Sequence, residues 1–455
     1  MASNPTAALA TFAARLAYTD LPPKVIDMAK LVALDAIGCA LGAFKEDPRK
    51  AQIAVKLATQ FGATQQATVI GGSRTHPAVA ALSNGMLVNA ADNDDTHKRA
   101  LAHLGSVVVP AALAANEARN GTGRQLIVAL VAGYEVAARI GMAVMPSHYR
   151  FWHSTATNGT FGAATAASVA WGFDVEGVRT ALGFAGTQAA GLNTFFESGD
   201  DSKSVHPGKA AMNGLLAAML AELGATSPPD VLGHPKGYLV AFSLEPRLDV
   251  LTSGLGSTWE ILQNGFKLYP SILASHSPIG AALEIAATQA VAPERIRSVE
   301  VRTYATVKSH FSSKDVETTM GARLSVPYCV AVALVDRQVT QAQFAPDRFR
   351  DPRVRAILEK VDIVADPDLS PLYPEKFPAR VIVTLEGGET VEASVMYPKG
   401  DPSNPLSPEE LMQKFRRNLH GVFDVDDINR LLETLLSIEN RKVSDLGRLL
   451  TSRSA

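Results

Sequence analysis

Cysteine is scarce in this chain of 455 residues, which contains only Cys39 and Cys329. Two cysteines cannot form a disulfide framework, and one isolated bridge is not expected in a chain of this size. We therefore expect a reducing, cytoplasmic environment. Iron–sulfur clusters are usually held by several cysteine thiolates, so chemistry that depends on such a cluster is also excluded.

An excess of charge of one sign is also missing. The formal net charge is -2, and no basic run stands out, so neither nucleic acid nor a membrane surface is expected as a partner. The most apolar segment, 126–145, is interrupted by Glu135 and Arg139. An acid four residues before a base favours an ion pair on one helix, which predicts a buried helix rather than a transmembrane one. The N-terminus lacks the pattern of a secretory signal.

Small and apolar residues dominate what is present. Hydrophobic residues make up 47% of the chain and charged residues 19%, as in globular proteins with a large interior. Residues 1–265 read as successive helices rich in Ala and Gly, which predicts a dense helical bundle. Thr122 and Gln125 occupy capping-box positions before one helix, and Asp174 is placed to cap another.

The pattern changes near residue 265. Residues 295–307 and 361–366 read as strands, and 379–397 as a hairpin turning at Gly387 and Gly388. A helix is expected at 326–336, and Ser407 with Glu410 opens a return to amphipathic helices. The predicted fold is mainly α, with a large all-helical domain from both chain ends (1–265 and 401–455) and an inserted α+β domain (266–400).

The stretch NAADNDDTHKRALAHLG, residues 89–105, concentrates ionisable groups between apolar flanks. Clustered carboxylates raise one another's pKa, and histidines titrate near neutrality, so the stretch favours proton transfer. Three alternatives stay open. A calcium loop fits poorly, because His97 and His103 stand where glycine and glutamate are expected. A zinc or manganese site from these histidines and an aspartate lacks a standard spacing. The aspartates could also simply cap helices.

Three other polar stretches precede small-residue helices or join the domains. Residues 147–164 contain His153, residues 197–214 contain Lys203, and residues 264–280 contain Lys267 and His276. Helix N-termini and basic side chains favour anions, and clefts between domains are common sites for small molecules. Together these stretches predict a pocket for a multiply charged carboxylate.

At these residues the chain resembles the MmgE/PrpD family. The resemblance covers nearly the whole chain and is carried by several motifs in order: DNDDTH…H at 92–103, VAGYEVAARIG at 131–141, WHSTATNGTFGAA at 152–164, GDDSKSVHPGKAA at 199–211, FKLYP…SHS at 266–277 and KGDPSNPLSPEEL at 399–411. It implies that the α+β domain is a lid over a helical domain, with the site between them. It also implies a homodimer that uses no metal and no organic cofactor.

The resemblance also implies roles for single residues. His103 or His153 would act as base or acid, and Asp92 would orient its partner. Lys203 and Lys267 would hold substrate carboxylates, and Tyr328 would exchange a proton from the lid side. The substrate-binding candidates, from the matched motifs and the neighbouring histidines, are Thr96, Lys203, Lys267, His97 and His276.

The reactions of this family include 2-methylcitrate dehydration, cis-aconitate decarboxylation and iminodisuccinate epimerisation. They share the making or breaking of a C–H bond next to a carboxylate, which needs a tuned base and cations that hold the developing charge. We expect a cofactor-independent lyase that dehydrates a citrate-type acid. Decarboxylation, epimerisation and non-catalytic carboxylate binding are the alternatives. Asn93, His97, Lys98 and Arg99 depart from the usual family pattern in the loop expected to touch substrate.

Overall fold

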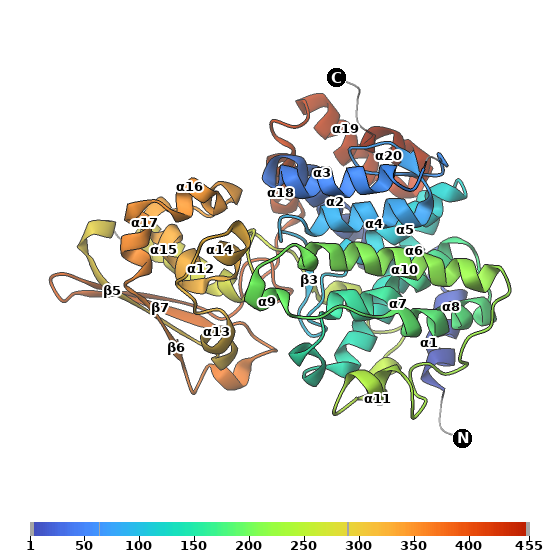
Figure 1. Cartoon of the computed structure of the whole chain (residues 1–455), viewed down its shortest axis with the longest axis horizontal. Helices are drawn as coiled ribbons and strands as arrows, with labels where there is room; N and C mark the ends of the chain where they lie inside the picture. Colours follow the sequence, from blue (N-terminus) through green and yellow to red (C-terminus); the bar gives the residue numbers. More distant parts are fainter. Residues whose placement is uncertain (1–3, 63, 289–290, 452–455) are drawn as a thin grey trace.

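The computed structural model describes residues 4–62, 64–288 and 291–451. The fold is mainly α, as the sequence predicts. Figure 1 shows a large helical body, which carries both chain ends, beside a smaller body that contains the only four-stranded sheet of the described residues. The parts of the predicted domain ranges that fall on residues 1–3, 63, 289–290 and 452–455 lie outside the described residues.

The helical body is built from both halves of the chain. Its N-terminal part comprises α1 (Pro5–Arg15), α2 (Pro23–Glu46), α3 (Pro48–Thr59), α4 (Pro77–Asn89), α5 (Gly105–Ala118), α6 (Gly123–Val144), α7 (Ser154–Ala170), α8 (Val175–Gln188), α9 (Phe195–Ser198), α10 (Ser202–Glu222) and α11 (Tyr238–Phe242). The C-terminal helices α18 (Pro408–Leu419), α19 (Val425–Leu436) and α20 (Val443–Leu450) return to this body, and α18 packs against α2.

Small residues set the spacing of the central helices. A Cβ atom on Gly85 of α4 would lie 2.6 Å from the Cα atom of Gly208 on α10. Only glycine at both positions permits this approach, which confirms the dense packing expected from the composition. The close contact fixes the end of α4 against the start of α10.

Helix α6 crosses the middle of this body. The predicted capping box is present at its start, with Thr122 as the N-cap and Gln125 in the first turn. Among the described helices it alone is long and apolar enough to cross a membrane, but the whole of its apolar window is buried inside the protein. The predicted ion pair is present, with Arg139 Nε 3.3 Å from Glu135 Oε2, and Arg139 also donates to three backbone carbonyls. These bonds offset the cost of burying two charges.

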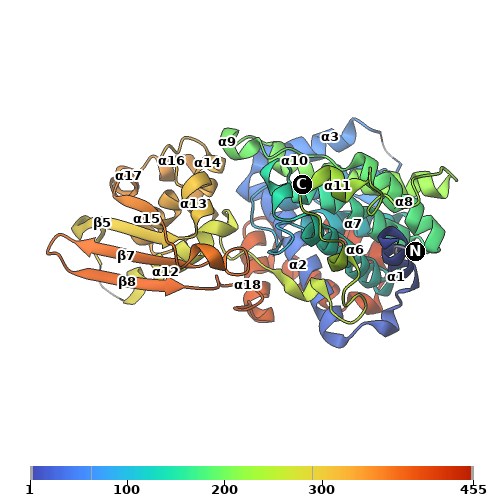
Figure 2. The ribbon, with the colours of Figure 1, turned by 90° about the horizontal axis from the view of Figure 1, so that it is seen from below.

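The smaller body, which we call the lid, has its own hydrophobic core. Its sheet has the order β6-β5-β7-β8, formed by β5 (Ile296–Thr303), β6 (Val361–Ala365), β7 (Ala379–Leu385) and β8 (Thr390–Val395). β5 and β6 are parallel, and β7 and β8 form the predicted hairpin. The lid helices are α12 (His276–Thr288), α13 (Ala305–His310), α14 (Thr319–Leu324), α15 (Val326–Asp336), α16 (Pro346–Phe349) and α17 (Pro352–Leu358). Figure 2 shows the sheet extending away from the helical body.

Two short strands connect the ionisable loop to the segment that enters the lid. β3 (Thr96–His97) pairs with β4 (Asn264–Gly265), so that Thr96 lies opposite Gly265 and His97 opposite Asn264. Because successive side chains of a strand point to opposite faces, Thr96 and His97 are directed to different sides. This pairing holds the predicted catalytic loop beside Lys267.

Candidate active site

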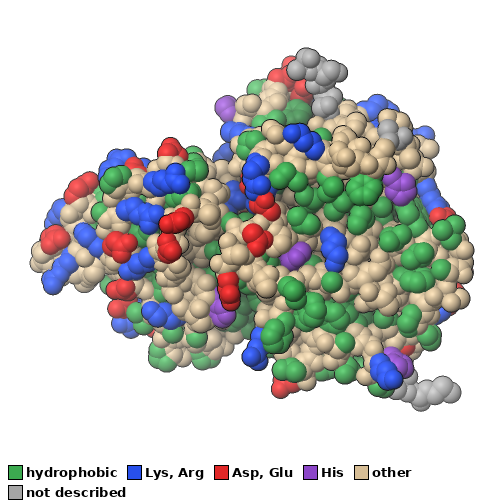
Figure 3. Space-filling view, in the orientation of Figure 1, with side chains coloured by type: hydrophobic (Ala, Val, Ile, Leu, Met, Phe, Trp, Pro, Cys, Tyr) green, Lys and Arg blue, Asp and Glu red, His purple; other side chains and the backbone are tan. Residues whose placement is uncertain are grey.

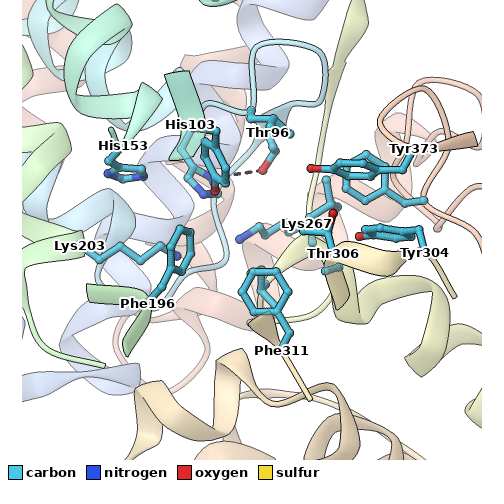
Figure 4. A pocket seen from close by; sticks show the side chains of 16 residues that line it. Thr96, His103, His153, Phe196, Lys203, Lys267, Tyr304, Thr306, Phe311 and Tyr373 are labelled. Carbon is cyan, nitrogen blue, oxygen red and sulfur yellow. Dashed lines mark hydrogen bonds between the residues drawn. The ribbon is translucent and has the colours of Figure 1, made fainter. Parts of the chain in front are cut away.

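A small cavity of about 60 Å³ lies where the helical body meets the lid. Residues of both bodies line this inner cavity: Thr96, Leu101, His103, Tyr149, His153, Phe196, Lys203, Lys267, Ile272, Leu273, Ala274, Tyr304, Thr306, Phe311, Tyr373 and Phe377. Figure 4 shows the histidines and lysines on one side and the two lid tyrosines opposite them. Cations and proton-transfer groups therefore face hydroxyl donors across one space.

Asp92 holds the two lysines in place. Its carboxylate is fully buried and lies 2.6 Å from Lys203 Nζ and 2.5 Å from Lys267 Nζ. Burial alone would raise the pKa of Asp92, but the two ammonium groups and His103 hold it well below its usual range. Burial lowers the pKa of Lys203 to about 8, against the attraction of Asp92. One carboxylate thus faces two ammonium groups that can bind an anionic ligand. A second carboxylate, that of Asp94, lies close by, with its Oδ2 3.8 Å from His103 Nδ1.

His103 is oriented by the loop that precedes it. Its Nδ1 lies 2.9 Å from the Asp95 carbonyl and 3.2 Å from Thr96 Oγ1. Because a carbonyl can only accept, Nδ1 carries the proton, and Nε2 of the neutral ring is a free base. Burial is the main cause that lowers the pKa of His103 to about 4, and Lys267 and Lys203 lower it further, against the raising effect of Asp94 and Asp92. The ring is therefore neutral near pH 7.

His153 stands at the N-cap position of α7 and is almost completely buried. Its ring centre lies 6.4 Å from that of His103. Its Nδ1 lies 3.1 Å from Nδ1 of His206, a half-buried residue of α10. Burial and the neighbouring histidines hold the pKa of His153 well below its usual range. Two neutral imidazoles thus line the same cavity and can serve as acid and base in turn.

The other aspartates of the loop are structural. Asp94 accepts from the Asn89 amide, at 2.9 and 3.0 Å. Asp95 accepts from the Gly105 backbone at the start of α5 and from the Tyr134 hydroxyl at 2.7 Å. Burial raises the pKa of Asp95 to about 7. The alternative in which the loop aspartates support helix ends therefore holds for Asp95, while Asp92 serves the cavity.

Four residues predicted for the site do not line the inner cavity: Asp92, which pairs with two lysines that do, and His97, His276 and Tyr328. His97 turns to the opposite face of β3, where its Nε2 lies 3.2 Å from Glu260 Oε2. His276 is buried at the start of α12 with its ring 5.2 Å from that of Tyr269. Tyr328 belongs to the lid core, and its hydroxyl donates to the Gln343 carbonyl. The structure places these three side chains away from the inner cavity, so their assignment to substrate binding or proton delivery gains no support from it and stays a prediction.

Three tyrosines that line the cavity were not predicted: Tyr149, Tyr304 and Tyr373. Tyr304 and Tyr373 stack with ring centres 4.4 Å apart. Burial raises the pKa of all three, to about 12 for Tyr373, so each hydroxyl stays protonated. The buried Tyr304 hydroxyl has no hydrogen-bond partner among the described residues. The available sequence signal was the position of Tyr304 near the end of a predicted strand of the α+β domain.

A metal ion would have to use Asp92, Asp94 and His103, whose ligand atoms lie within 4.8 Å of one another. Both oxygens of Asp92, however, are already paired with ammonium groups. A divalent cation there would stand beside two positive charges at close range, which is unfavourable in a buried site. The donor set fits two lysines better than a metal.

The fold and the site define a class: a helical protein with an α+β lid, and between them a buried site with cations and two histidines. The MmgE/PrpD N-terminal domain model matches residues 7–251, and the MmgE/PrpD C-terminal domain model matches residues 269–440. The chain belongs to the MmgE/PrpD family, which confirms the resemblance seen in its motifs.

Named relatives are similar over nearly their full length. A cis-aconitate decarboxylase of Aspergillus terreus is 31% identical, over 98% of this chain and 95% of the relative. The cis-aconitate decarboxylase of Homo sapiens is 29% identical, over 97% of this chain and 93% of the relative. The 2-methylcitrate dehydratase of Escherichia coli strain K12 is 24% identical, over 90% of this chain and 89% of the relative.

Proposed function

We propose that this chain is a lyase acting on a small tricarboxylate, and that decarboxylation of cis-aconitate is its first candidate reaction. The observation that carries the proposal is a pair of buried lysines, Lys203 and Lys267, both paired with Asp92. These lysines line the same cavity as two histidines, His103 and His153. The similarity to cis-aconitate decarboxylases supports decarboxylation ahead of dehydration, since the dehydratase of Escherichia coli is less similar.

In this proposal, Lys203 and Lys267 hold the carboxylates that remain on the substrate, and the Tyr304 hydroxyl donates a further hydrogen bond. The bond from carbon to the departing carboxylate breaks, and carbon dioxide leaves. Its electron pair is delocalised over the neighbouring double bond, and a histidine proton is added to carbon. Fixed cations stabilise the charge that develops before the proton arrives.

Substrate binding itself prepares the acid. A polyanion placed beside His103 adds negative charge where burial, and to a smaller extent two lysines, keep the pKa of the ring low in the free protein. An opposite charge nearby favours the protonated imidazole, so the pKa of His103 rises when substrate binds. The site then holds a proton donor mainly when its substrate is present.

Dehydration of a 2-methylcitrate-type acid is the second candidate, because the site has two separate imidazoles. One would remove the proton next to a carboxylate, and the electron pair would form the double bond. The other would protonate the departing hydroxyl. The distance of 6.4 Å between the rings leaves room for groups on two neighbouring carbons to be served separately.

The test is incubation in D2O with cis-aconitate, 2-methylcitrate, citrate and iminodisuccinate, followed by NMR. We expect loss of carbon dioxide from cis-aconitate and one deuterium on carbon. Water loss from 2-methylcitrate would select the second candidate, and scrambled stereochemistry would select an epimerase. Binding without turnover or exchange in any sample would contradict a lyase. His103→Ala should remove several orders of magnitude in rate while the far-ultraviolet spectrum is retained.

A homodimer in the cytoplasm, active without metal or organic cofactor, belongs to the same proposal. Apolar side chains gather on the face of the helical body seen in Figure 3. Leu216 on the C-terminal half of α10 and Leu223, directly after its last residue, are 42% and 83% exposed. Patches of this kind often mark protein interfaces. Light scattering should give twice the mass of the chain, and treatment with EDTA should leave the rate unchanged.

A further inference from the structure

His206 carries chemistry that the proposed mechanism does not use. It lies on α10 three residues after Lys203, so the two side chains share one face of the helix. Lys203 reaches Asp92, while the His206 ring meets the His153 ring, with centres 5.3 Å apart. Helix α10 therefore carries both the candidate substrate-binding cation, Lys203, and the residue that contacts Nδ1 of the candidate acid His153.

The contact between the two rings is a direct hydrogen bond. The two Nδ1 atoms are 3.1 Å apart, which requires one of them to carry a proton and the other to accept it. Phe195 packs against both imidazoles: its ring centre lies 5.0 Å from that of His153 and 5.9 Å from that of His206. The pair is thus enclosed by an apolar side chain, and the position of one shared proton fixes both tautomers.

The two rings differ in their access to solvent. His153 is 2% exposed, whereas His206 is half-buried at the edge of the helical body. The charged groups that face His206 are Asp200, in the loop before α10, and Lys209, one turn later on the same helix. A neutral ring that gives up its Nε2 proton becomes an anion unless its Nδ1 gains a proton. While substrate covers Nε2 of His153, that proton can come only through His206, the neighbour that reaches the surface.

We propose that His206 is the positioning residue and proton relay of His153. The inference rests on the proposed function and takes His153 as the histidine that protonates the substrate carbon. When Nδ1 of His206 holds the shared proton, the neutral His153 ring carries its own proton on Nε2 and is an acid. As that proton passes to the substrate carbon, the shared proton moves to Nδ1 of His153. A proton from water then joins Nε2 of His206.

This sequence balances the reaction. One proton enters from solvent for each proton placed on carbon, and neither ring gains a net charge. The pair ends with both tautomers exchanged, and His153 has become a base at Nε2. Exchange with water after product release, one proton gained at His153 Nε2 and one lost at His206 Nε2, restores the starting state.

Two substitutions separate a relay from a simple hydrogen-bond partner. His206→Gln keeps an amide that can bond His153 but cannot pass a proton through a ring, and His206→Ala removes both functions. We expect KM to stay within about twofold and kcat to fall roughly 100-fold in both variants, as for other lost proton-transfer groups. Added imidazole should restore part of kcat in His206→Ala only. His420→Gln, at an exposed position of the helical body, is the matched control.

Full activity in His206→Gln would show that only a hydrogen bond is needed and would overturn the relay, as would full activity in His206→Ala. A readout without substrate is the 15N NMR spectrum of histidine-labelled protein. It should show one protonated and one unprotonated Nδ1 for this pair, and replacement of His206 should remove one of the two signals and shift the other. If the wild-type protein converts none of the four acids, the proposed function fails, while this spectrum still decides whether the two rings share a proton.

Discussion

At the scale of single residues, two tyrosine hydroxyls differ in their partners. The Tyr304 hydroxyl at the cavity has none among the described residues, whereas the Tyr328 hydroxyl in the lid core donates to a backbone carbonyl. Tyr304→Phe removes a buried hydroxyl that lines the cavity and has no partner among the described residues. A hydrogen bond to a charged group is worth about 1.5–3 kcal/mol, so we expect KM for the active tricarboxylate to rise roughly 10- to 100-fold. Stability should change little, because the free protein loses no hydrogen bond.

Tyr328→Phe is the matched control, and it tests the predicted role of that residue. The Tyr328 hydroxyl donates to the Gln343 carbonyl inside the lid. We expect its loss to leave kcat/KM unchanged and to lower the free energy of unfolding by about 1 kcal/mol. Urea titrations and steady-state kinetics on both variants give the comparison. A loss of kcat in Tyr328→Phe equal to that of a catalytic residue would support the role predicted from sequence.

The pKa of Lys203 sets the alkaline limit of activity. Burial lowers it to about 8, so the positive charge is present at pH 7 and is lost as the pH rises through 8. We expect kcat/KM to fall about tenfold per pH unit above that value, since the neutral amine no longer holds a carboxylate. Arginine stays charged at every accessible pH, so in Lys203→Arg the fall near pH 8 should disappear, whatever the absolute rate. If kcat/KM of Lys203→Arg still falls near pH 8, the group that titrates there is not Lys203.

At the scale of elements, local signals were predictable and contacts between distant segments were not. The capping boxes at Thr122 and Ser407, the cap at Asp174 and the lid helix at 326–336 are all present, since each depends on a few adjacent residues. The sequence analysis treated residues 197–214 as a polar stretch before a helix, but α10 begins within that stretch, at Ser202, and contains Pro207. Proline is usually excluded from helix interiors, which hid the first two turns.

The candidate site shows the same division. Asp92, His103, His153, Lys203 and Lys267 were predicted because each belongs to a recognisable local motif, and the structure brings these separate motifs to one place. Tyr304 and Tyr373 meet only through the lid fold, which no local pattern reports. The side to which His97 turns could not be predicted, because the pairing of β3 with β4 depends on Asn264, which lies 167 residues later (264 − 97).

The close approach of α4 and α10 predicts a coupled loss of stability and activity. In Gly85→Ala the new methyl group would lie 2.6 Å from Gly208 Cα, so the helices must separate. Overpacking of this kind costs about 1–3 kcal/mol. Because α4 leads into Asp92 and α10 carries Lys203, we also expect KM to rise. Gly387→Ala in the hairpin is the control, since nothing lies within 4 Å of its new methyl group. Equal urea midpoints in the two variants would contradict the packing argument.

At the scale of the whole molecule, the site opens outward between the two bodies. A larger cavity of about 660 Å³ shares Leu101, Tyr149, Phe196, Thr306 and Tyr373 with the inner cavity. This outer cavity is also lined by Arg99 and by the exposed Arg150. Arg99 is paired with Glu260 at 2.7 Å, while the Arg150 guanidinium lies over the Phe151 ring. The shared residues make the outer cavity the natural entrance for substrate.

A cation at this entrance should increase the rate of encounter with a polyanion without affecting the chemistry. We expect Arg150→Gln to lower kcat/KM for the active tricarboxylate about 3- to 10-fold at low ionic strength and to leave kcat unchanged. The difference from wild type should shrink as salt is added, because screening weakens attraction beyond about 10 Å at 0.1 M. Arg350→Gln is the matched control: that residue is also exposed and lies over a neighbouring phenylalanine, but it lines neither cavity. If both variants lose kcat/KM equally, the attraction comes from overall charge, and substrate enters without guidance from this face of the molecule.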